Sequence, residues 1–247
     1  RLHIVAFDLA RDPAGRWTVL AQRTQGPSGL GYVLHNRLTI SRQFPDAFRE
    51  LRVQHIASSY RRLLDTVDAL AREVADGQTP RVVLLTPGRF SETYFEHAYL
   101  ARYLGLPLVE GRDLTVSDDR LYVRTIAGPK RIDAVWRWID TNALDPMSFD
   151  SRSEIGVANL FDAWSRGGLE IANWPGVEVL ESRAFSAFLP RLCGRLLGET
   201  PILPNIATWW CGQAEEASVV RERFDELVIA PAFGQQVEGL VGLEPRA

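Results

Sequence analysis

A glycine-rich segment near the start of the chain has the residue types of an anion-binding loop. The sequence RTQGPSGLGYVLHNR, residues 23–37, places small residues with free amide groups between Arg23 and Arg37. Glycine lets the backbone approach a ligand closely, amides can hold phosphate oxygens, and arginine binds such oxygens in a forked geometry. The side-chain carbonyl oxygen of Asn36 could bind a hard cation such as magnesium. An ordinary glycine-rich hairpin loop explains the same pattern without a ligand.

A second candidate site lies in residues 86–110. An apolar run, residues 82–85, leads into a Thr-Pro-Gly turn, a helix rich in polar and aromatic residues, and a second apolar run at 107–109. Such a strand–loop–helix–strand unit places the N-terminus of the helix where ligands bind, and the helix dipole suits an anion. Four side chains lie at the start of this helix: Glu92, Tyr94, Glu96 and His97. They could orient an amine or a metal-bound water, or they could form a solvated face.

A third group of polar residues surrounds the end of a strand predicted over residues 132–138. Arg137 lies between two tryptophans, so strand alternation points it away from both rings. It could reach a ligand carboxylate or pair with a neighbouring aspartate. Asp140, Asp145 and Asp150 follow and could hold a cation, but Asp145 before a proline is equally typical of a turn.

The predicted strands and helices that position these residues indicate an α/β fold. Strands alternate with helices in the middle of the chain, which indicates a mostly parallel sheet with helices on both faces. We expect the first two strands and the glycine loop to belong to another layer or subdomain. Strands are predicted at 2–9, 17–21, 82–85, 107–109, 132–138, 169–172 and 227–229, a hairpin at 114–116 and 121–124, and helices at 44–75, 153–165 and 185–197.

Composition excludes several classes of function. The net charge is −3 and the pI is about 5.9, so there is no basic field of the kind that drives nucleic-acid binding. No apolar run has the roughly 20 residues that a membrane span needs. Cys193 and Cys211 make a disulfide framework improbable, and we expect a cytoplasmic protein. The chain starts at Arg1 directly in a strand pattern, so we expect it to be part of a longer protein.

Several segments together resemble the circularly permuted ATP-grasp type 2 proteins, relatives of glutathionylspermidine synthase. These are ETYFEHAYLARYLG at 92–105, FLPRLCGRLLGE at 188–199, TWWCG at 208–212 and the glycine-rich segment at the front. The resemblance implies a Rossmann-like pre-ATP-grasp domain with part of a circularly permuted ATP-grasp module. It divides the chain into an N-terminal ATP-grasp segment with connecting helices (1–78), the pre-ATP-grasp domain (79–212) and the start of the remaining module (213–247).

The resemblance also implies an activity, namely ATP-dependent ligation of a carboxylate to an amine through an acyl-phosphate, with ATP and magnesium as cofactors. By position, Arg23 is then the candidate catalytic residue, and Asn36 is a magnesium ligand. Candidate nucleotide- or substrate-binding residues are Ser28, Gly29, Gly31, Arg37, Tyr94, Glu96, Arg137 and Asp140.

Three positions depart from the family pattern. His35 replaces a glutamate, Gln22 replaces an acidic residue, and Ala230 replaces a lysine. Neutral groups are poor substitutes for carboxylates around a hard dication, and a lost charge-assisted contact costs on the order of 1.5–3 kcal/mol. We therefore expect a ligase-like protein with a degenerate MgATP site. The alternatives are a working ATP-grasp ligase whose site uses arginine where relatives use lysine, an inactive homologue that binds a paralogous or fused enzyme, and an unrelated Rossmann-like domain for a small phosphorylated ligand.

Overall fold

The computed structural model describes residues 1–233, and the chain divides into two compact units. Unit 1 comprises Arg1–Ile4 and Gln25–Gly176, and unit 2 comprises Val5–Thr24 and the chain from Val177 onward. The boundaries of these units differ from those of the three predicted segments, 1–78, 79–212 and 213–247. The reason is that unit 2 combines the first hairpin with the C-terminal helices. The assignment of those three segments to ATP-grasp modules stays a prediction.

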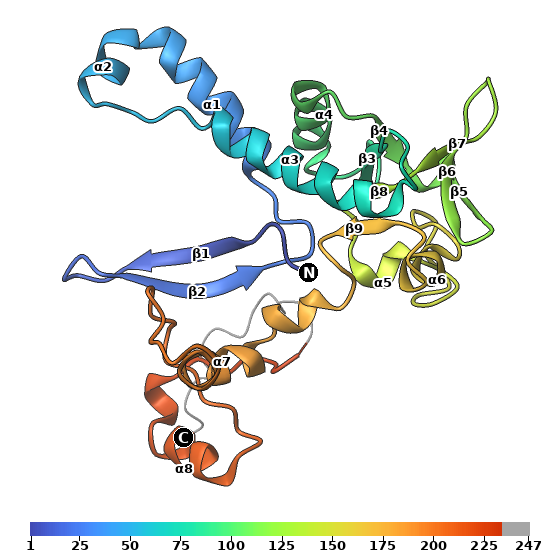
Figure 1. Ribbon diagram of the computed structural model, residues 1–247. Helices are drawn as coiled ribbons and strands as arrows, with labels where there is room; N and C mark the ends of the chain where they lie inside the picture. Colours follow the sequence, from blue (N-terminus) through green and yellow to red (C-terminus); the bar gives the residue numbers. More distant parts are fainter. Residues whose placement is uncertain (234–247) are drawn as a thin grey trace. The chain divides into compact units, whose positions relative to one another are not determined.

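Unit 1 contains a four-stranded, wholly parallel sheet in the order β4-β3-β8-β9 (Figure 1). Its strands are β3 (Val82–Thr86), β4 (Leu108–Glu110), β8 (Ala134–Arg137) and β9 (Glu170–Ala172). Every residue of β3 and β8 is buried, which is typical of central parallel strands covered on both faces. The mixed α/β class with a parallel sheet is therefore confirmed. Because the strand order reverses between β3 and β8, their carboxyl ends form a topological switch point, where ligands of such sheets usually bind.

Both faces of this sheet are covered. On one face lie α1 (Leu30–Gln43), α3 (Ala57–Val74) and α4 (Tyr94–Leu104). Alternate strand residues such as Leu84 and Trp136 pack there against Leu34 and Leu100. The opposite face carries Val83, Leu85, Val135 and Ile171, which pack against α6 (Leu160–Ser165) and the small sheet described next.

A three-stranded antiparallel sheet completes the core of unit 1. Its strands are β5 (Leu114–Ser117), β6 (Arg120–Val123) and β7 (Lys130–Ile132), and they confirm the predicted hairpin. The single strand predicted over 132–138 is wrong, because β7 and β8 belong to different sheets. Asp133 separates them, and its carboxylate accepts a hydrogen bond from the Arg81 amide at 2.9 Å and pairs with Arg131.

Two helix predictions are wrong at their boundaries. The helix predicted over 44–75 is interrupted: α1 begins at Leu30 and ends at Gln43, and α2 (Pro45–Glu50) ends before Arg52, which has a positive φ of 49°. The helix predicted from Ser153 begins only at Leu160. Ser153 instead donates a hydrogen bond to the Ala143 carbonyl at 2.6 Å, which holds a compact loop between α5 (Thr141–Leu144) and α6.

The described part of unit 2 contains a hairpin and two α-helices. The antiparallel strands β1 (Ala6–Arg11) and β2 (Trp17–Arg23) confirm the two strands predicted at the front of the chain. The helix predicted at 185–197 is α7 (Arg183–Leu197), capped by Ser182 and ended by Gly198 with φ 70°. α8 (Ala214–Glu222) follows. The strand predicted at 227–229 is wrong, since these residues join no sheet among residues 1–233.

Candidate functional site

The glycine loop ends in a hydrogen-bonded cluster around the carboxylate of Glu96. One carboxylate oxygen accepts from the amides of Gly29 and Gly31 at 2.7 and 2.8 Å, and the other accepts from the Ser28 hydroxyl at 2.6 Å. Glu96 lies in the first turn of α4 and is completely buried. The three donors predicted to contact phosphate therefore bind an internal carboxylate.

This arrangement follows from where α1 begins. Its first turn leaves backbone amides without partners inside the helix, and the positive end of the helix dipole favours an anion there. Gly29 occupies the cap position with φ 120° and has no side chain to cap the helix, so Glu96 supplies the cap from another element. A Cβ atom on Gly31 would lie 2.7 Å from the Glu96 Cγ, so only glycine permits this contact.

The start of the loop covers one side of the switch point. The Gln25 side-chain oxygen accepts from the Thr141 amide at 2.8 Å, just beyond β8. Gly26 has φ 83°, and a Cβ there would lie 3.2 Å from the Trp138 Cα. The loop thus contacts the backbone at the carboxyl end of β8. The sequence suggests an exposed phosphate loop, but the structure shows residues 25–31 packed onto the sheet edge and onto α4.

A buried histidine fixes the other side of the switch point. The His97 Nδ1 lies 2.9 Å from the hydroxyl of Thr86, at the end of β3, and its Nε2 lies 3.1 Å from the hydroxyl of Thr93, which precedes α4. The ring packs at 4.6 Å from that of Trp138. Burial lowers the pKa of His97 from 6.5 to about 4, so the ring is neutral near pH 7. His97 joins strand to helix and carries no charge toward a ligand.

The lowered pKa predicts an acid-sensitive fold. Between pH 6.5 and about 4 the unfolded chain binds a proton at His97 that the folded protein does not bind, so stability falls as pH falls through this window. The expected slope is up to about 1.4 kcal/mol per pH unit. Urea unfolding from pH 7 to 5 measures it, and His97→Gln should flatten it whereas the exposed control His55→Gln should not. Equal slopes in both variants would contradict the assignment.

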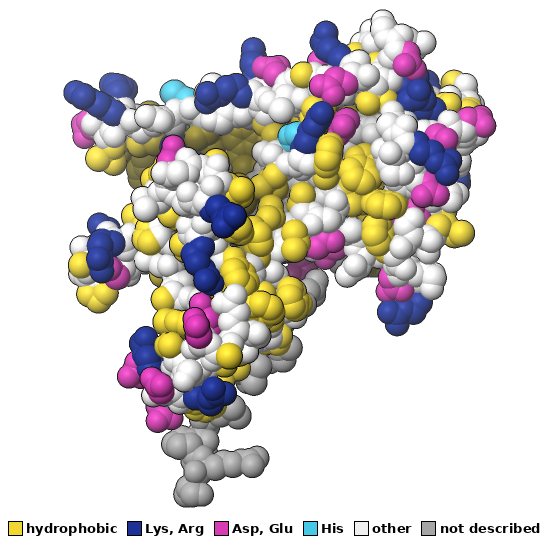
Figure 2. Space-filling view, turned by 60° about the horizontal axis from the view of Figure 1, so that its bottom comes forward, with side chains coloured by type: hydrophobic (Ala, Val, Ile, Leu, Met, Phe, Trp, Pro, Cys, Tyr) yellow, Lys and Arg dark blue, Asp and Glu magenta, His cyan; other side chains and the backbone are white. Residues whose placement is uncertain are grey.

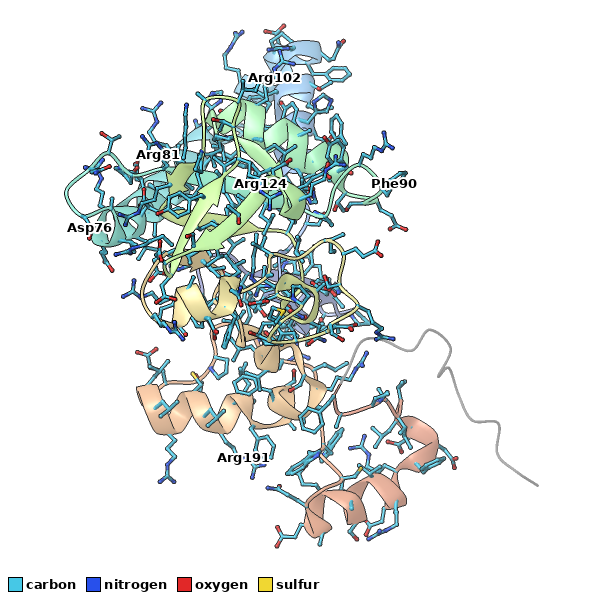
Figure 3. The ribbon with its side chains drawn as sticks, turned by 90° about the vertical axis from the view of Figure 1, so that its right-hand side faces the viewer. Asp76, Arg81, Phe90, Arg102, Arg124 and Arg191 are labelled. Carbon is cyan, nitrogen blue, oxygen red and sulfur yellow. The ribbon has the colours of Figure 1, made fainter. Side chains whose placement is uncertain are left out.

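Two exposed residues at the switch point were missed by the sequence analysis. Arg89 and Phe90 follow the turn after β3, and the Arg89 guanidinium lies 4.8 Å from the Phe90 ring centre. Phe90 is 88% exposed and lies on a loop at the edge of the unit in Figure 3. The sequence feature that could have identified them is their position between an apolar run, which forms a buried strand, and the following helix. A cation and an aromatic ring at such a position face solvent.

Arg137 does not face solvent. Its side chain is completely buried and donates to the carbonyls of Asn173 at 2.8 Å and Ile139 at 2.7 Å. It also donates to the Thr141 hydroxyl at 3.2 Å and the Trp174 carbonyl at 3.3 Å. These contacts tie the chain after β8 to the chain after β9. Arg137 therefore has a structural role, and we do not include it in the proposed site.

The three aspartates do not converge. Asp145 is completely buried and accepts from the amides of Met147, Asn159 and Phe161 at 2.8, 3.1 and 2.9 Å. It organises the loop, in agreement with the turn interpretation. Asp150 forms an ion pair with Arg152 at 2.9 Å. Asp140 is exposed at the start of α5 and stays a candidate for ligand contact.

The remaining predicted residues are spread over several elements. Arg23 pairs with Asp8 at 2.7 Å within the β1–β2 hairpin of unit 2, and this pair raises the pKa of the guanidinium. Arg37 donates to the Gln54 carbonyl at 2.9 Å. Asn36 is exposed on α1, and Tyr94 is half-buried at the first position of α4.

His35, the neighbour of Asn36, belongs to an aromatic cluster on the outer faces of α1 and α4. Its ring meets those of Phe95 and Tyr99 edge-on at 5.7 and 5.2 Å. Phe95 and Tyr99 stack on each other at 5.8 Å. A separate surface cavity of about 580 Å³ lies between the start of α3 and the end of α4, and its lining includes no predicted site residue.

The chain belongs to the circularly permuted ATP-grasp type 2 family, whose model matches residues 1–245. It is 39% identical over 93% of its length to an uncharacterized protein of Synechocystis sp.. Two uncharacterized proteins of Mycobacterium tuberculosis are 37% and 40% identical over 98% and 93% of the chain. The matches cover 47%, 43% and 26% of these relatives, so the chain spans less than half of their length. Among residues 1–233, no helix is both long and apolar enough to cross a membrane.

Proposed function

We propose that this chain is part of an ATP-grasp carboxylate–amine ligase-like protein whose MgATP site is degenerate. Membership of the ATP-grasp family supports the ligase-like class. The observation that carries the degenerate site is the contact of Glu96 with Ser28, Gly29 and Gly31, because these donors are then not free for phosphate oxygens. We further propose that the glutathionylspermidine synthase-like proteins are its functional relatives and that the parallel sheet is the Rossmann-like pre-ATP-grasp domain.

The residues of this chain do not fit MgATP well. Asn36 is the predicted magnesium ligand, but its neighbour His35 contacts aromatic rings and offers no carboxylate. Within the described part of the chain, no three His, Cys, Asp or Glu residues are grouped so that they could hold a metal ion. Ala230 provides no cation for a phosphate.

The proposal assigns roles to the polar residues that stay accessible. Arg23 and Asp8 share an exposed ion pair, from which the guanidinium could turn to a carboxylate or phosphoryl oxygen. Arg89 presents a second exposed cation, and Asp140 an exposed carboxylate for an amine. Within unit 1, Arg89 and Asp140 would bind and orient the acid and amine substrates, and Arg37 and Tyr94 would support them on α1 and α4. We propose a cytoplasmic protein.

A specific observation favours the alternative, an inactive homologue that acts as a scaffold. Large apolar side chains of unit 2 are exposed, including Trp17 at 49%, Leu196 at 74% and Ile202 at 98%. Figure 2 shows hydrophobic side chains at the surface of the face it presents. Exposed apolar surface of this kind often marks contacts with another protein or domain. A paralogous enzyme or a fused domain would then be the partner.

Restoring the family residues tests the proposed function. The double variant His35→Glu/Ala230→Lys should raise the magnesium-dependent affinity of the intact protein for ATP by about 10-fold or more, because each charge-assisted contact contributes about 1.5–3 kcal/mol. Isothermal titration calorimetry with and without magnesium measures the change. The control His35→Glu/Val228→Lys places the lysine at an exposed neighbouring position and should gain less. No difference between the two double variants would contradict a degenerate MgATP site at these positions.

A further inference from the structure

We propose that Glu96 closes the glycine loop to external anions, so that a phosphoryl or carboxylate oxygen reaches Ser28, Gly29 and Gly31 only when the Glu96 carboxylate leaves them. The loop is then a self-occupied anion site, and Glu96 is an internal competitor of the ligand class that the loop would otherwise take. This inference rests on the proposed function in one respect: both concern the glycine loop that is expected to contact phosphate.

The first reason is that the donors are already satisfied. The carboxylate of Glu96 receives two backbone amides and one hydroxyl at 2.6–2.8 Å, the range of strong charge-assisted hydrogen bonds. The amides belong to the start of a 14-residue helix, whose dipole adds to the attraction. An external anion would have to replace all three contacts.

The second reason is that the carboxylate leaves no room and adds repulsion. Glu96 is completely buried, and its Cγ would lie 2.7 Å from a Cβ on Gly31. A phosphate beside a buried carboxylate would also experience like-charge repulsion in a medium of low dielectric constant. Ser28, in contrast, is exposed, so small solutes can approach the loop from solvent once Glu96 is removed.

The test is chemical rescue of Glu96→Ala in the intact protein. This variant deletes a CH₂–COO⁻ group and should leave a space that formate or inorganic phosphate can fill. We expect a lower melting temperature than that of the wild type, and a recovery of about 3 °C or more in saturating phosphate or formate beyond sodium chloride of equal ionic strength. The wild type and the exposed control Glu92→Ala should respond to phosphate no more than to chloride.

Glu96→Gln separates occupancy from charge. Its carbonyl oxygen can still accept from Gly29 and Gly31, and its amide nitrogen can donate to the Ser28 hydroxyl, so the loop stays filled. We expect this variant to fold and to show no phosphate response. If Glu96→Ala does not fold, Glu96→Asp is used instead, because it withdraws the carboxylate by one methylene and should give a weaker rescue in the same direction.

The results of these rescue experiments test this inference independently of the proposed function. Anion-specific rescue confined to Glu96→Ala or Glu96→Asp supports it. Equal phosphate responses in the wild type and the variants, or no response in any of them, would overturn it. Binding of MgATP by the wild type would contradict the degenerate site, but it would leave the interpretation of the rescue unchanged, because the rescue uses phosphate and formate alone.

Discussion

Arg137→Met is expected to lower the free energy of unfolding by about 3–5 kcal/mol. The guanidinium donates to three backbone carbonyls and one hydroxyl in the fully buried region between the ends of β8 and β9. Methionine fills a similar volume but leaves these acceptors without that donor, and each buried unsatisfied group costs about 1–3 kcal/mol. Chemical denaturation of the wild type and the variant measures the difference.

The matched control is Arg124→Met, since Arg124 is exposed at the end of β6 and should change stability by less than about 0.5 kcal/mol. Arg137→Lys should fall between the two, because a single ammonium group lacks the forked geometry that reaches several acceptors. A variant Arg137→Met as stable as the wild type would show that the network contributes little, and Arg137 would return to the list of ligand-binding candidates.

Asp145→Asn is expected to cost about 2–4 kcal/mol. The two carboxylate oxygens accept from three backbone amides, and asparagine replaces one oxygen by a group that can only donate. One or two buried amides then face an NH₂ group. Thermal unfolding should show a clear decrease in melting temperature, of about 2–4 °C for each kcal/mol in a chain of this size.

Thermal unfolding also distinguishes two roles for Asp145, which either organises the loop or binds a cation. Adding magnesium should leave the melting temperature of the wild type and of Asp145→Asn unchanged. The control is Asp150→Asn, which removes only an exposed pair with Arg152 and should change the melting temperature much less than Asp145→Asn does. A magnesium-dependent stabilisation lost in Asp145→Asn would restore the cation site.

The local pattern was sufficient for the central strand–helix–strand unit. The buried run at Val82–Thr86 and the helix at Tyr94–Leu104 were both predicted, because apolar periodicity and a Pro-Gly turn define such elements within a short window. The helix at 185–197 was predicted from apolar periodicity as well, and in the structure it begins two residues earlier, at Arg183. The parallel sheet followed from the alternation of strands and helices.

The site could not be predicted to the same depth, because its contacts join residues far apart in sequence. Glycines and a serine at 28–31 favour an anion, but nothing near them shows that the anion is Glu96, 65 residues from Gly31. Strand alternation gives the direction of Arg137 relative to its neighbouring tryptophans, yet it does not show that the guanidinium ends among buried carbonyls. Likewise, the division of the 132–138 run between two sheets depends on the contacts of Asp133.

The most direct test of the degenerate site is calorimetric titration of MgATP into the intact wild-type protein, with magnesium-free ATP as the control. We predict no magnesium-dependent binding in the micromolar range, because the donors of the glycine loop are held by Glu96 and the carboxylates and lysine expected around MgATP are absent at positions 22, 35 and 230. Micromolar binding that requires magnesium would contradict this prediction and would favour a working ATP-grasp ligase.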